Sequence, residues 1–526
     1  MEQRSPNNPS NLRVDVGDAS HVQKTAVESQ SYEVMLEWFK LIVASAVVLF
    51  LISIVFTGIG NGWMVMRVHP AIGFLILFCI LVLMAYVEAL HYSCVNLEKV
   101  DPAAFEKEYP RAAENQRLVN NATLVKRFLL GRQGFVIAIV FTATQLTAFP
   151  YMPTDLWGMP KGLIDVLFKT GLPGVALVLT VGQLISQLFV ESYTLAFHNL
   201  PGVWFVIKLC LATEYIGLCH WSWLLYEISN RLACIKIVRA KKLMESTAFD
   251  ADGQEGDPLS PTIRNRGPDF DLGVKDNSNL SAFDIFRYIW STALSLSAIC
   301  VVLYGISTGG YILHVPVWAA YIIAGTVLTL LFYLEGLMIA VAATTDWDRK
   351  TWEHAYPRAY KVHEMVNQPN KVKAFIIGRQ FMTLLTGFVL AEVFTFSFLE
   401  NDGGMPDWLF YLIFRSGFPG VLLVLSIGQL VPELLAAEYP LRFLNLRGVW
   451  LVSRACLFFD SLAVGHAGWA IYYMSRGIVC RGESAKSEGS ENDRFKDMKL
   501  ESAELYHKTG SPYGGPRRSK VPNQVV

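Results

Sequence analysis

The sequence has few charged residues and no motif of a soluble enzyme. Charged residues make up only 17% of the 526-residue chain, and acidic and basic residues balance to a formal net charge of zero. A basic stripe of the kind that binds nucleic acid is therefore missing. A glycine-rich nucleotide loop, a His-Glu-x-x-His pair and a nucleophile elbow are missing too. We therefore expect neither an enzyme nor a nucleic-acid-binding protein, and no cofactor.

Cysteines are few, and their spacing excludes the usual metal-binding pairs. Six of the eight cysteines fall inside apolar runs, namely Cys79, Cys94, Cys210, Cys219, Cys300 and Cys456. They are expected to be small core residues rather than metal ligands. The first 30 residues are polar and lack the apolar run of a cleavable signal peptide. The first apolar run is then expected to be the first inserted segment.

Long apolar runs are what the chain has in abundance. Hydrophobic residues make up 52% of the sequence, and about 20 consecutive apolar residues cross a bilayer as a helix. Ten such runs lie near residues 38–59, 71–95, 133–150, 171–194, 203–228, 286–308, 317–343, 380–399, 417–437 and 448–475. The sequence therefore predicts an all-α membrane protein with ten transmembrane helices in a lipid bilayer.

The two halves of the chain repeat one another. The stretch Gly171–Gln187 (GLPGVALVLTVGQLISQ) matches Gly417–Glu433 (GFPGVLLVLSIGQLVPE), 246 residues later. Further residues match at offsets of 246 or 247, including Glu88 with Glu335, Arg132 with Arg379, Gln133 with Gln380, Glu214 with Asp460, and His220 with His466. A nearly constant offset over so many positions indicates an internal duplication.

Each copy holds five of the ten runs. Because five is odd, two fully inserted copies would have opposite orientations in the bilayer, so we expect two inverted five-helix repeats. The expected boundaries are a disordered tail at 1–31, repeat 1 at 32–228, a flexible linker at 229–283, repeat 2 at 284–475 and a second disordered tail at 476–526. The basic residues of equivalent loops nearly cancel, so the orientation of the termini stays open. The oligomeric state stays open as well.

Ionisable residues within the spans come in matched pairs. Each costs roughly 2.5 to 3.5 kcal/mol to insert, so each marks a candidate site. Glu88 and Glu335 lie near the end of a span, and Arg132 and Arg379 open the next one. A carboxylate and a guanidinium in such neighbours can form a structural salt bridge. Alternatively, the carboxylates together with exposed backbone carbonyls can bind a cation.

Amides and carboxylates also line one face of a later span. Gln183 and Gln187 are four residues apart, as are Gln429 and Glu433 in the second copy, so each pair shares a helical face. Such groups suit the recognition of uncharged, hydroxyl-bearing solutes because an amide offers both a donor and an acceptor. The alternative is that they form hydrogen bonds between helices, as polar residues in spans commonly do.

A third set of matched residues lies in the last run of each copy. Glu214 precedes His220 by six residues, and Asp460 precedes His466 by six. Six residues along a helix place two side chains about 120° apart, so neither pair chelates a metal by itself. We expect these residues to act in a helix contact or a gate, with direct ligand binding as the alternative.

With these motifs the sequence resembles the silicon (silicic acid) transporters over roughly residues 38–475. The resemblance rests on the Gly-Arg-Gln motifs at 131–133 and 378–380, each following a span that ends in a glutamate motif, and on the later Gly-x-Pro-Gly-Val and Gly-Gln-Leu segments. That family pairs each Gly-Arg-Gln with Glu-Gly-x-Gln. Here the first copy reads Glu-Ala-Leu-His at 88–91 and the second reads Glu-Gly-Leu-Met at 335–338, so both glutamines are replaced.

The resemblance implies sodium-coupled uptake of orthosilicic acid or a similar small neutral solute by a secondary active transporter. Sodium would bind at Glu88 or Glu335. The solute would contact the amide and carboxyl groups of the other pairs, namely Gln133, Gln380, Gln183, Gln429, Gln187 and Glu433. The plasma membrane is the expected location, with an intracellular vesicle membrane as the alternative. A passive channel, and a membrane receptor or scaffold, remain the rival functions.

Overall fold

The computed structural model describes residues 16–97, 100–119, 122–153, 158–218, 220–226, 228, 281–345, 347, 352–368, 371–401 and 404–461. Most of the predicted linker (229–283) and the whole predicted tail from 476 lie outside these residues. The predicted N-terminal tail (1–31) is described from Val16, where the first helix already begins, so the second half of that segment is helical. Every regular element in the described part of the chain is a helix, in agreement with the predicted all-α class.

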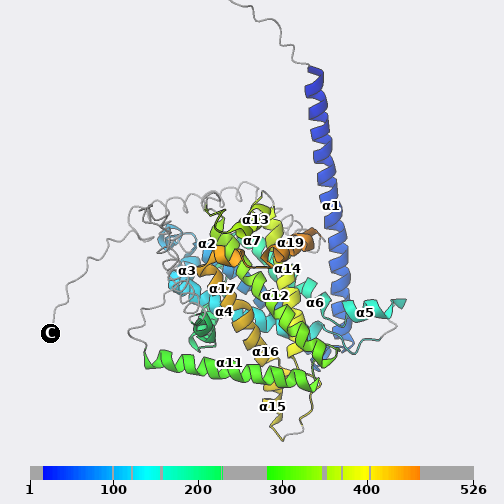
Figure 1. The fold of residues 1–526 in the computed structure, drawn as a ribbon, viewed down its shortest axis with the longest axis vertical. Coiled ribbons are helices and arrows are strands. Elements are labelled where there is room, and N and C mark those ends of the chain that lie inside the picture. Colours follow the sequence, from blue (N-terminus) through cyan, green and yellow to red (C-terminus); the bar gives the residue numbers. More distant parts are fainter. Residues whose placement is uncertain are drawn as a thin grey trace, which may run out of the picture.

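The first copy forms one long series of helices (Figure 1). They are α1 (Val16–Gly60), α2 (Pro70–Leu97), η1 (Pro102–Ala104), α3 (Pro110–Leu118), α4 (Ala122–Thr147), α5 (Lys161–Leu167), α6 (Leu172–Leu177), η3 (Val178–Leu184), α7 (Ile185–Ser192), α8 (Thr194–His198) and α9 (Val203–Tyr215). A short helix, His220–Tyr226, follows α9 at an angle of 57°.

The second copy reproduces this series. Its helices are α11 (Ala282–Thr308), α12 (Val317–Thr344), α13 (Pro357–Val366), α14 (Lys371–Phe394), α15 (Asp407–Phe410), η6 (Tyr411–Arg415), α16 (Phe418–Leu423), η7 (Val424–Leu430), α17 (Val431–Glu438), α18 (Pro440–Leu444) and α19 (Val449–Ser461). Most bounds from α12 onward repeat those of the first copy at the offsets of 246 or 247 found in the sequence, so the duplication extends to the helices themselves.

Eight helices of the described chain are long and apolar enough to cross a membrane, or nine if α9 and the helix after it count as one bent span. The ten predicted spans are thus only partly matched. The fifth run of the first copy forms the 13-residue α9 and then turns at Gly217, where φ is +91°. The fifth run of the second copy forms α19, which is also 13 residues long, and beyond Ser461 it lies outside the described residues.

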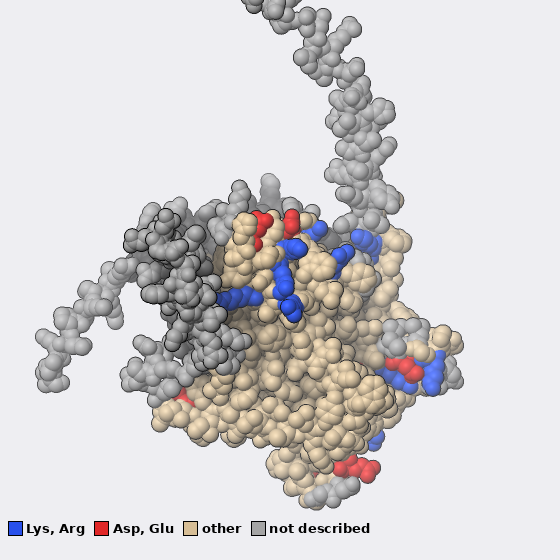
Figure 2. Space-filling view, viewed as in Figure 1, with Lys and Arg blue, Asp and Glu red and all other residues tan. Residues whose placement is uncertain are grey.

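The outer surface of the helices is apolar, as a lipid-facing surface requires. Figure 2 shows a broad area free of Lys, Arg, Asp and Glu, with charged residues only toward its edges. Large exposed apolar side chains occur along α1, α2, α11 and α12, among them Phe50, Phe78, Ile289 and Ile322. These helices therefore form the outer layer, and the more deeply buried α4 and α14 lie inside together with the spans Leu172–Val190 and Asp407–Glu438.

Equivalent residues of the two copies meet along the central pair α4 and α14. Val140 packs onto Gly387, where an added Cβ atom would lie 3.1 Å from the Val140 side chain. Farther along, the rings of Tyr151 and Phe398 are 6.2 Å apart, centre to centre. Both pairs are related by the offset of 247. The approximate twofold axis that relates the copies therefore runs along α4 and α14.

The two central helices also run in the same direction. Arg132 and Arg379, in the first half of each helix, line one cavity. The opposite ends of α4 and α14 lie together as well: Ala148, just after α4, is in one apolar cluster with Ile312, and the Ile312 backbone N–H donates to the Glu392 carbonyl near the end of α14 at 3.0 Å. Since α4 and α14 are both candidate spans, the copies have the same orientation, and the expected inversion is wrong. Four full spans per copy, an even number, give this result.

The two ends of the molecule can now be named. The α5 end comprises the described residues 61–69, 148–153, 158–171, 309–316, 395–401 and 404–417, which lie between α1 and α2, α4 and α6, α11 and α12, and α14 and α16. The α3 end holds α3, α8 and α9 with their counterparts α13, α18 and α19. The start of α11 lies at the α3 end, because Arg287 donates a hydrogen bond to the Glu214 backbone carbonyl of α9 at 2.9 Å.

Candidate functional site

Two interrupted spans carry the glutamines that the sequence singled out. In each copy an α-helical start (α6 or α16) changes into a π-helical segment (η3 or η7) and then back into an α-helix (α7 or α17). Wide π-helical turns inside α-helices are frequent at functional sites. Gln183 and Gln429 each lie in the last turn of such a segment. Gly182 and Gly428, next to them, do not break the helix. Instead, Gly182 allows close contact with α2 and Gly428 allows close contact with α12.

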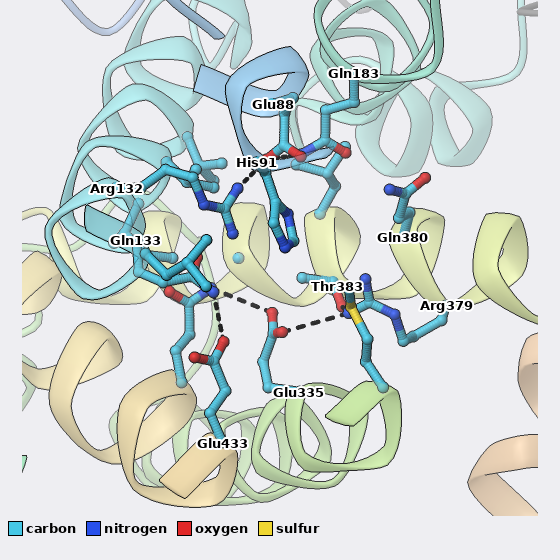
Figure 3. Close-up of a pocket in the computed structure, with 18 of the residues that line it drawn as sticks. Glu88, His91, Arg132, Gln133, Gln183, Glu335, Arg379, Gln380, Thr383 and Glu433 are labelled. Carbon is cyan, nitrogen blue, oxygen red and sulfur yellow. Dashed lines mark hydrogen bonds and ion pairs between the residues drawn. The ribbon is translucent and has the colours of Figure 1, made fainter. Parts of the chain in front are cut away.

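These glutamines face a cavity between the two copies (Figure 3). The cavity has a volume of about 80 Å³, and a water molecule needs roughly 10–15 Å³ of such space. It therefore holds a few waters or one small solute. The polar side chains that line it are Glu88, His91, Tyr92, Arg132, Gln133, Gln183, Glu335, Arg379, Gln380, Thr383, Gln429 and Glu433.

Glu88 of the first copy accepts hydrogen bonds from three protein donors. Arg132 Nη1 lies 3.0 Å from its Oε1 atom. Gln187 Nε2 donates to Oε2 at 3.1 Å, and Gln183 Nε2 lies 3.4 Å from Oε1. Glu88 and Arg132 are both buried, so their pairing offsets much of the cost of removing two charges from water.

Glu335 repeats this arrangement in the second copy. Arg379 Nη1 lies 3.3 Å from its Oε2 atom, and Gln429 Nε2 donates to Oε1 at 3.2 Å. Arg379 also lies 3.5 Å from the hydroxyl of Thr383. The predicted glutamate and arginine pairs are thus brought together in both copies, and in this conformation each carboxylate is held by an arginine rather than open to an ion.

The glutamines of the two Gly-Arg-Gln motifs reach across to the opposite copy. Gln380 of α14 donates to Gln187 Oε1 of α7 at 2.8 Å. Gln133 of α4 donates to Glu433 Oε1 of α17 (Figure 3). These two bonds are related by the twofold axis, because Gln187 and Glu433 occupy equivalent positions. Both bonds tie one copy to the other directly at the cavity.

The carboxylates dictate how the amides are turned. A carboxylate only accepts hydrogen bonds, so each glutamine beside one must direct its Nε2 toward it and its Oε1 away. Gln187 directs Nε2 at Glu88, so its Oε1 faces Gln380, which must donate in turn. As a result, the Oε1 atoms of Gln183, Gln380 and Gln429 have no hydrogen-bond partner among the described residues. Three buried acceptors are left open around one small cavity.

Three further features of the cavity were not fully predicted. His91 lies one turn after Glu88 and projects into the cavity (Figure 3); its counterpart in the duplication is Met338, so no repeat signal pointed to it. Thr383, one turn after Arg379, was missed because a lone threonine in an apolar run is unremarkable. Gly131 has a packing role: a Cβ atom there would lie 1.9 Å from the Cys210 carbonyl oxygen of α9.

The residues Glu214 and His220 do not join the cavity. Glu214 accepts from Arg127 Nε at 2.8 Å and from Arg287 at 3.3 Å, and His220 Nε2 lies 4.0 Å away from it. This cluster fastens α9 to the starts of α4 and α11, a helix contact of the kind expected. In the second copy Asp460 lies in α19, and His466 is outside the described residues.

Metal-ligand clusters are not a feature of the described chain: it contains no group of three or more His, Cys, Asp or Glu side chains placed to hold a metal ion. A cation in the cavity would therefore rely on amide and hydroxyl oxygens beside at most two carboxylates. Oxygen ligands of this kind suit hard cations.

The comparison with known proteins identifies the family. No curated protein and no solved structure matches the chain. The family model described as "Silicon transporter" matches residues 31–241 and 279–506, which include all spans of both copies and every residue of the cavity. This apolar duplicated protein, with its Gly-Arg-Gln motifs facing a shared polar cavity, therefore belongs to the silicon transporter family.

Proposed function

We propose that the protein carries silicic acid across a membrane by sodium-coupled secondary active transport, and that the solute binds in the cavity between the two copies. The observation that carries this proposal is the set of three open amide oxygens on Gln183, Gln380 and Gln429. A buried acceptor without a donor costs roughly 1 to 3 kcal/mol. A solute that supplies hydroxyl donors removes that cost when it binds.

The volume of the cavity and its open acceptors limit the class of solute further. A cavity of about 80 Å³ accommodates a solute of a few heavy atoms, such as silicic acid with one silicon and four oxygens. Sugars and nucleotides are too large. An anion without protons is disfavoured, because it brings more acceptors to a site whose open groups are acceptors already. A neutral molecule with four hydroxyl groups fits both limits.

Transport by alternating access is supported by the way the copies are joined. Transporters with parallel repeats bind their substrate between the halves, which rock against each other. Here the cavity lies between the two halves, and bonds from Gln133 to Glu433 and from Gln380 to Gln187 cross it. Such bonds can break on one side as the halves rock. A permanently open channel would have no need of them.

The test is uptake of radiolabelled germanic acid, which has the same four hydroxyl groups, into vesicles that contain the purified protein. An inward sodium gradient should drive accumulation above the external concentration. Equal uptake with and without sodium would favour a passive channel. Absence of uptake under both conditions would overturn the proposed solute class.

Removing the open oxygens tests the binding site. The variants Gln183→Leu and Gln429→Leu each delete one acceptor, so we expect KM for germanic acid to rise roughly tenfold, since a lost hydrogen bond is worth about 1 to 1.5 kcal/mol. Gln116→Leu is a matched control, because Gln116 is buried and also has an open Oε1 but lies in α3 outside the cavity. An unchanged KM in both cavity variants would contradict the assignment.

A further inference from the structure

The cavity breaks its twofold symmetry at one charged position. Glu433 of the second copy is equivalent to Gln187 of the first, and both accept a hydrogen bond from the opposite Gly-Arg-Gln glutamine. Gln187 in turn donates a hydrogen bond to Glu88 at 3.1 Å. Glu433 cannot donate when it is ionised. Within the described part of the chain, no arginine or lysine forms an ion pair with it, in contrast to Glu88 and Glu335.

The charged side chains of the cavity do not sum to zero. Arg132 and Arg379 contribute two positive charges, and Glu88 and Glu335 balance them as two ion pairs. Glu433, when ionised, adds one negative charge that no Lys or Arg of the described residues balances in an ion pair, with His91 counted as neutral. A neutral solute leaves this charge unchanged. One monovalent cation, whether a proton or an alkali-metal ion, would remove it, and an uncompensated charge inside a membrane is costly.

We propose that Glu433 is the residue at which one monovalent cation binds together with the solute. This inference rests on the proposed transport function and assigns its coupling step to a residue. Gln429 lies one turn before Glu433 and contributes a buried open oxygen, Oε1, at the same cavity. A carboxylate and a nearby amide oxygen are suitable ligands for a hard cation.

The other ionisable groups of the cavity are poorer candidates. A cation at Glu88 or Glu335 would compete with an arginine already within 3.0 or 3.3 Å. His91 could take up a proton, but that would add a third positive charge to a cavity that already holds Arg132 and Arg379. Protonation or cation binding at Glu433 instead brings the total to zero.

The experiment compares wild type and Glu433→Gln in vesicles with radiolabelled germanic acid. Inward sodium and inward proton gradients are imposed separately, and the gradient that drives accumulation in wild type identifies the cation. In Glu433→Gln we expect the accumulation ratio to fall to one under either gradient. Exchange of labelled for unlabelled germanic acid should remain detectable, although slower than in wild type, because the three open amide oxygens remain. Glu433→Asp should retain gradient-driven accumulation.

Several outcomes would overturn the assignment. One is a folded Glu433→Gln protein that still accumulates germanic acid with the cation dependence of wild type. Another is a folded Glu433→Gln protein that also loses exchange, since Glu433 would then hold the solute itself. Failure of the proposed function would be visible separately, as an absence of transport by wild type.

A swapped variant covers the case in which Glu433→Gln does not fold. Gln187→Glu combined with Glu433→Gln moves the carboxylate to the equivalent position of the first copy, beside Glu88 and Gln380, and keeps the total charge of the polar groups around the cavity. Gradient-driven accumulation should persist in this double variant. Its loss in a protein that elutes as a single folded species would contradict a role based on the charge of the cavity.

Discussion

At the scale of single residues, the cavity shows how an acidic neighbour sets the chemistry of an amide. Gln183 and Gln429 each donate a hydrogen bond to a carboxylate, and Gln380 donates to the amide oxygen of Gln187. The Oε1 atom of each of the three has no hydrogen-bond partner among the described residues. The amide gives the site a hydrogen-bonding preference without adding charge. Replacing Gln183 or Gln429 by glutamate would instead place two carboxylates together, so the two residue types are not interchangeable at these positions.

A second pair of equivalent positions that differ between the copies, Gln145 and Glu392, lies at the α5 end, away from the cavity. Gln145 of α4 donates to the Ser416 carbonyl at 2.9 Å. Its equivalent in α14 is Glu392, which is 1% exposed and whose Oε1 atom has no partner among the described residues. An added Cβ atom on Gly171 would lie 3.5 Å from that Oε1 atom. The equivalent positions of the two copies thus carry an amide donor in one and a buried carboxyl group in the other.

We predict that Glu392→Gln stabilises the protein by about 1 kcal/mol. The amide restores a donor where the first copy has one, and it removes a buried carboxyl group with an unpaired oxygen. The measurement is the Tm of the purified protein in detergent, which should rise. The matched control is Gln145→Glu, which should lower Tm because it turns a carboxylate toward the Ser416 carbonyl. A fall in Tm for Glu392→Gln would refute this account.

At the scale of elements, glycine decides how closely α4 and α9 approach. Gly131 opens the first Gly-Arg-Gln motif, and a Cβ atom there would lie 1.9 Å from the Cys210 carbonyl oxygen. Backbone atoms cannot move aside as a flexible side chain can. The glycine of the motif therefore has a packing role, whereas the arginine and the glutamine face the cavity.

Gly131→Ala is accordingly expected to separate α4 from α9 and to displace Arg132, at a cost of about 3 kcal/mol or more. Loss of germanic acid uptake and a lower yield of monodisperse protein would be the readouts. Gly325→Ala is the matched control, since Gly325 also lies inside a spanning helix but has no atom within 4 Å of an added Cβ. Equal behaviour of the two variants would argue against the close contact.

The short helix α8 carries a buried histidine, His198. His198 Nδ1 lies 2.9 Å from the Ser93 hydroxyl, and burial lowers the pKa of His198 to about 3. The unfolded chain has a histidine pKa near 6.5 and binds a proton that the folded chain excludes. The associated stability is therefore complete above about pH 6.5 and declines as the pH falls toward 3.

Because of His198, we expect the free energy of unfolding to fall by about 1.4 kcal/mol per pH unit as the pH is lowered from 6.5 to 5. His198→Leu places there the residue found at the equivalent position 444 and should flatten that part of the profile. Tm measured against pH in both proteins tests this. A mutant profile as steep as that of wild type would assign the dependence to other groups.

At the scale of the whole molecule, the parallel arrangement changes how the basic residues are counted. Among the described residues, the α5 end carries four Lys or Arg residues in 61–69, 148–153, 158–171, 309–316, 395–401 and 404–417. The described residues of the α3 end carry seven in 100–119, 193–202, 352–368 and 439–448. In an inverted protein equivalent loops would cancel, but in a parallel one they add. An excess of Lys and Arg marks the cytoplasmic side.

We therefore predict that the α3 end, with the N-terminus and the linker between the copies, faces the cytoplasm. An epitope inserted after Gly158 should be accessible on intact cells, whereas epitopes at the N-terminus or in the linker should require permeabilisation. If the N-terminal and linker epitopes were found on opposite sides, the copies would be inverted after all, and the charge argument would fail with them.

The sequence by itself determined the apolar helical character, the duplication and the matched polar residues. Runs of about 20 apolar residues and a constant offset are local properties that need no knowledge of packing. The offset also revealed that Glu433 stands where the first copy has Gln187, although the bond from Gln133 that gives this difference its meaning comes from the opposite copy.

Only the tertiary structure decided the orientation of the copies and the polarity of the cavity. The fifth apolar run of the first copy is hydrophobic enough to suggest a span, yet it turns at Gly217 after 13 helical residues. One crossing fewer per copy reverses the predicted inversion. Which amide oxygens stay open was likewise beyond the sequence, because it depends on donors and acceptors that meet only when α4 and α14 bring the two copies together.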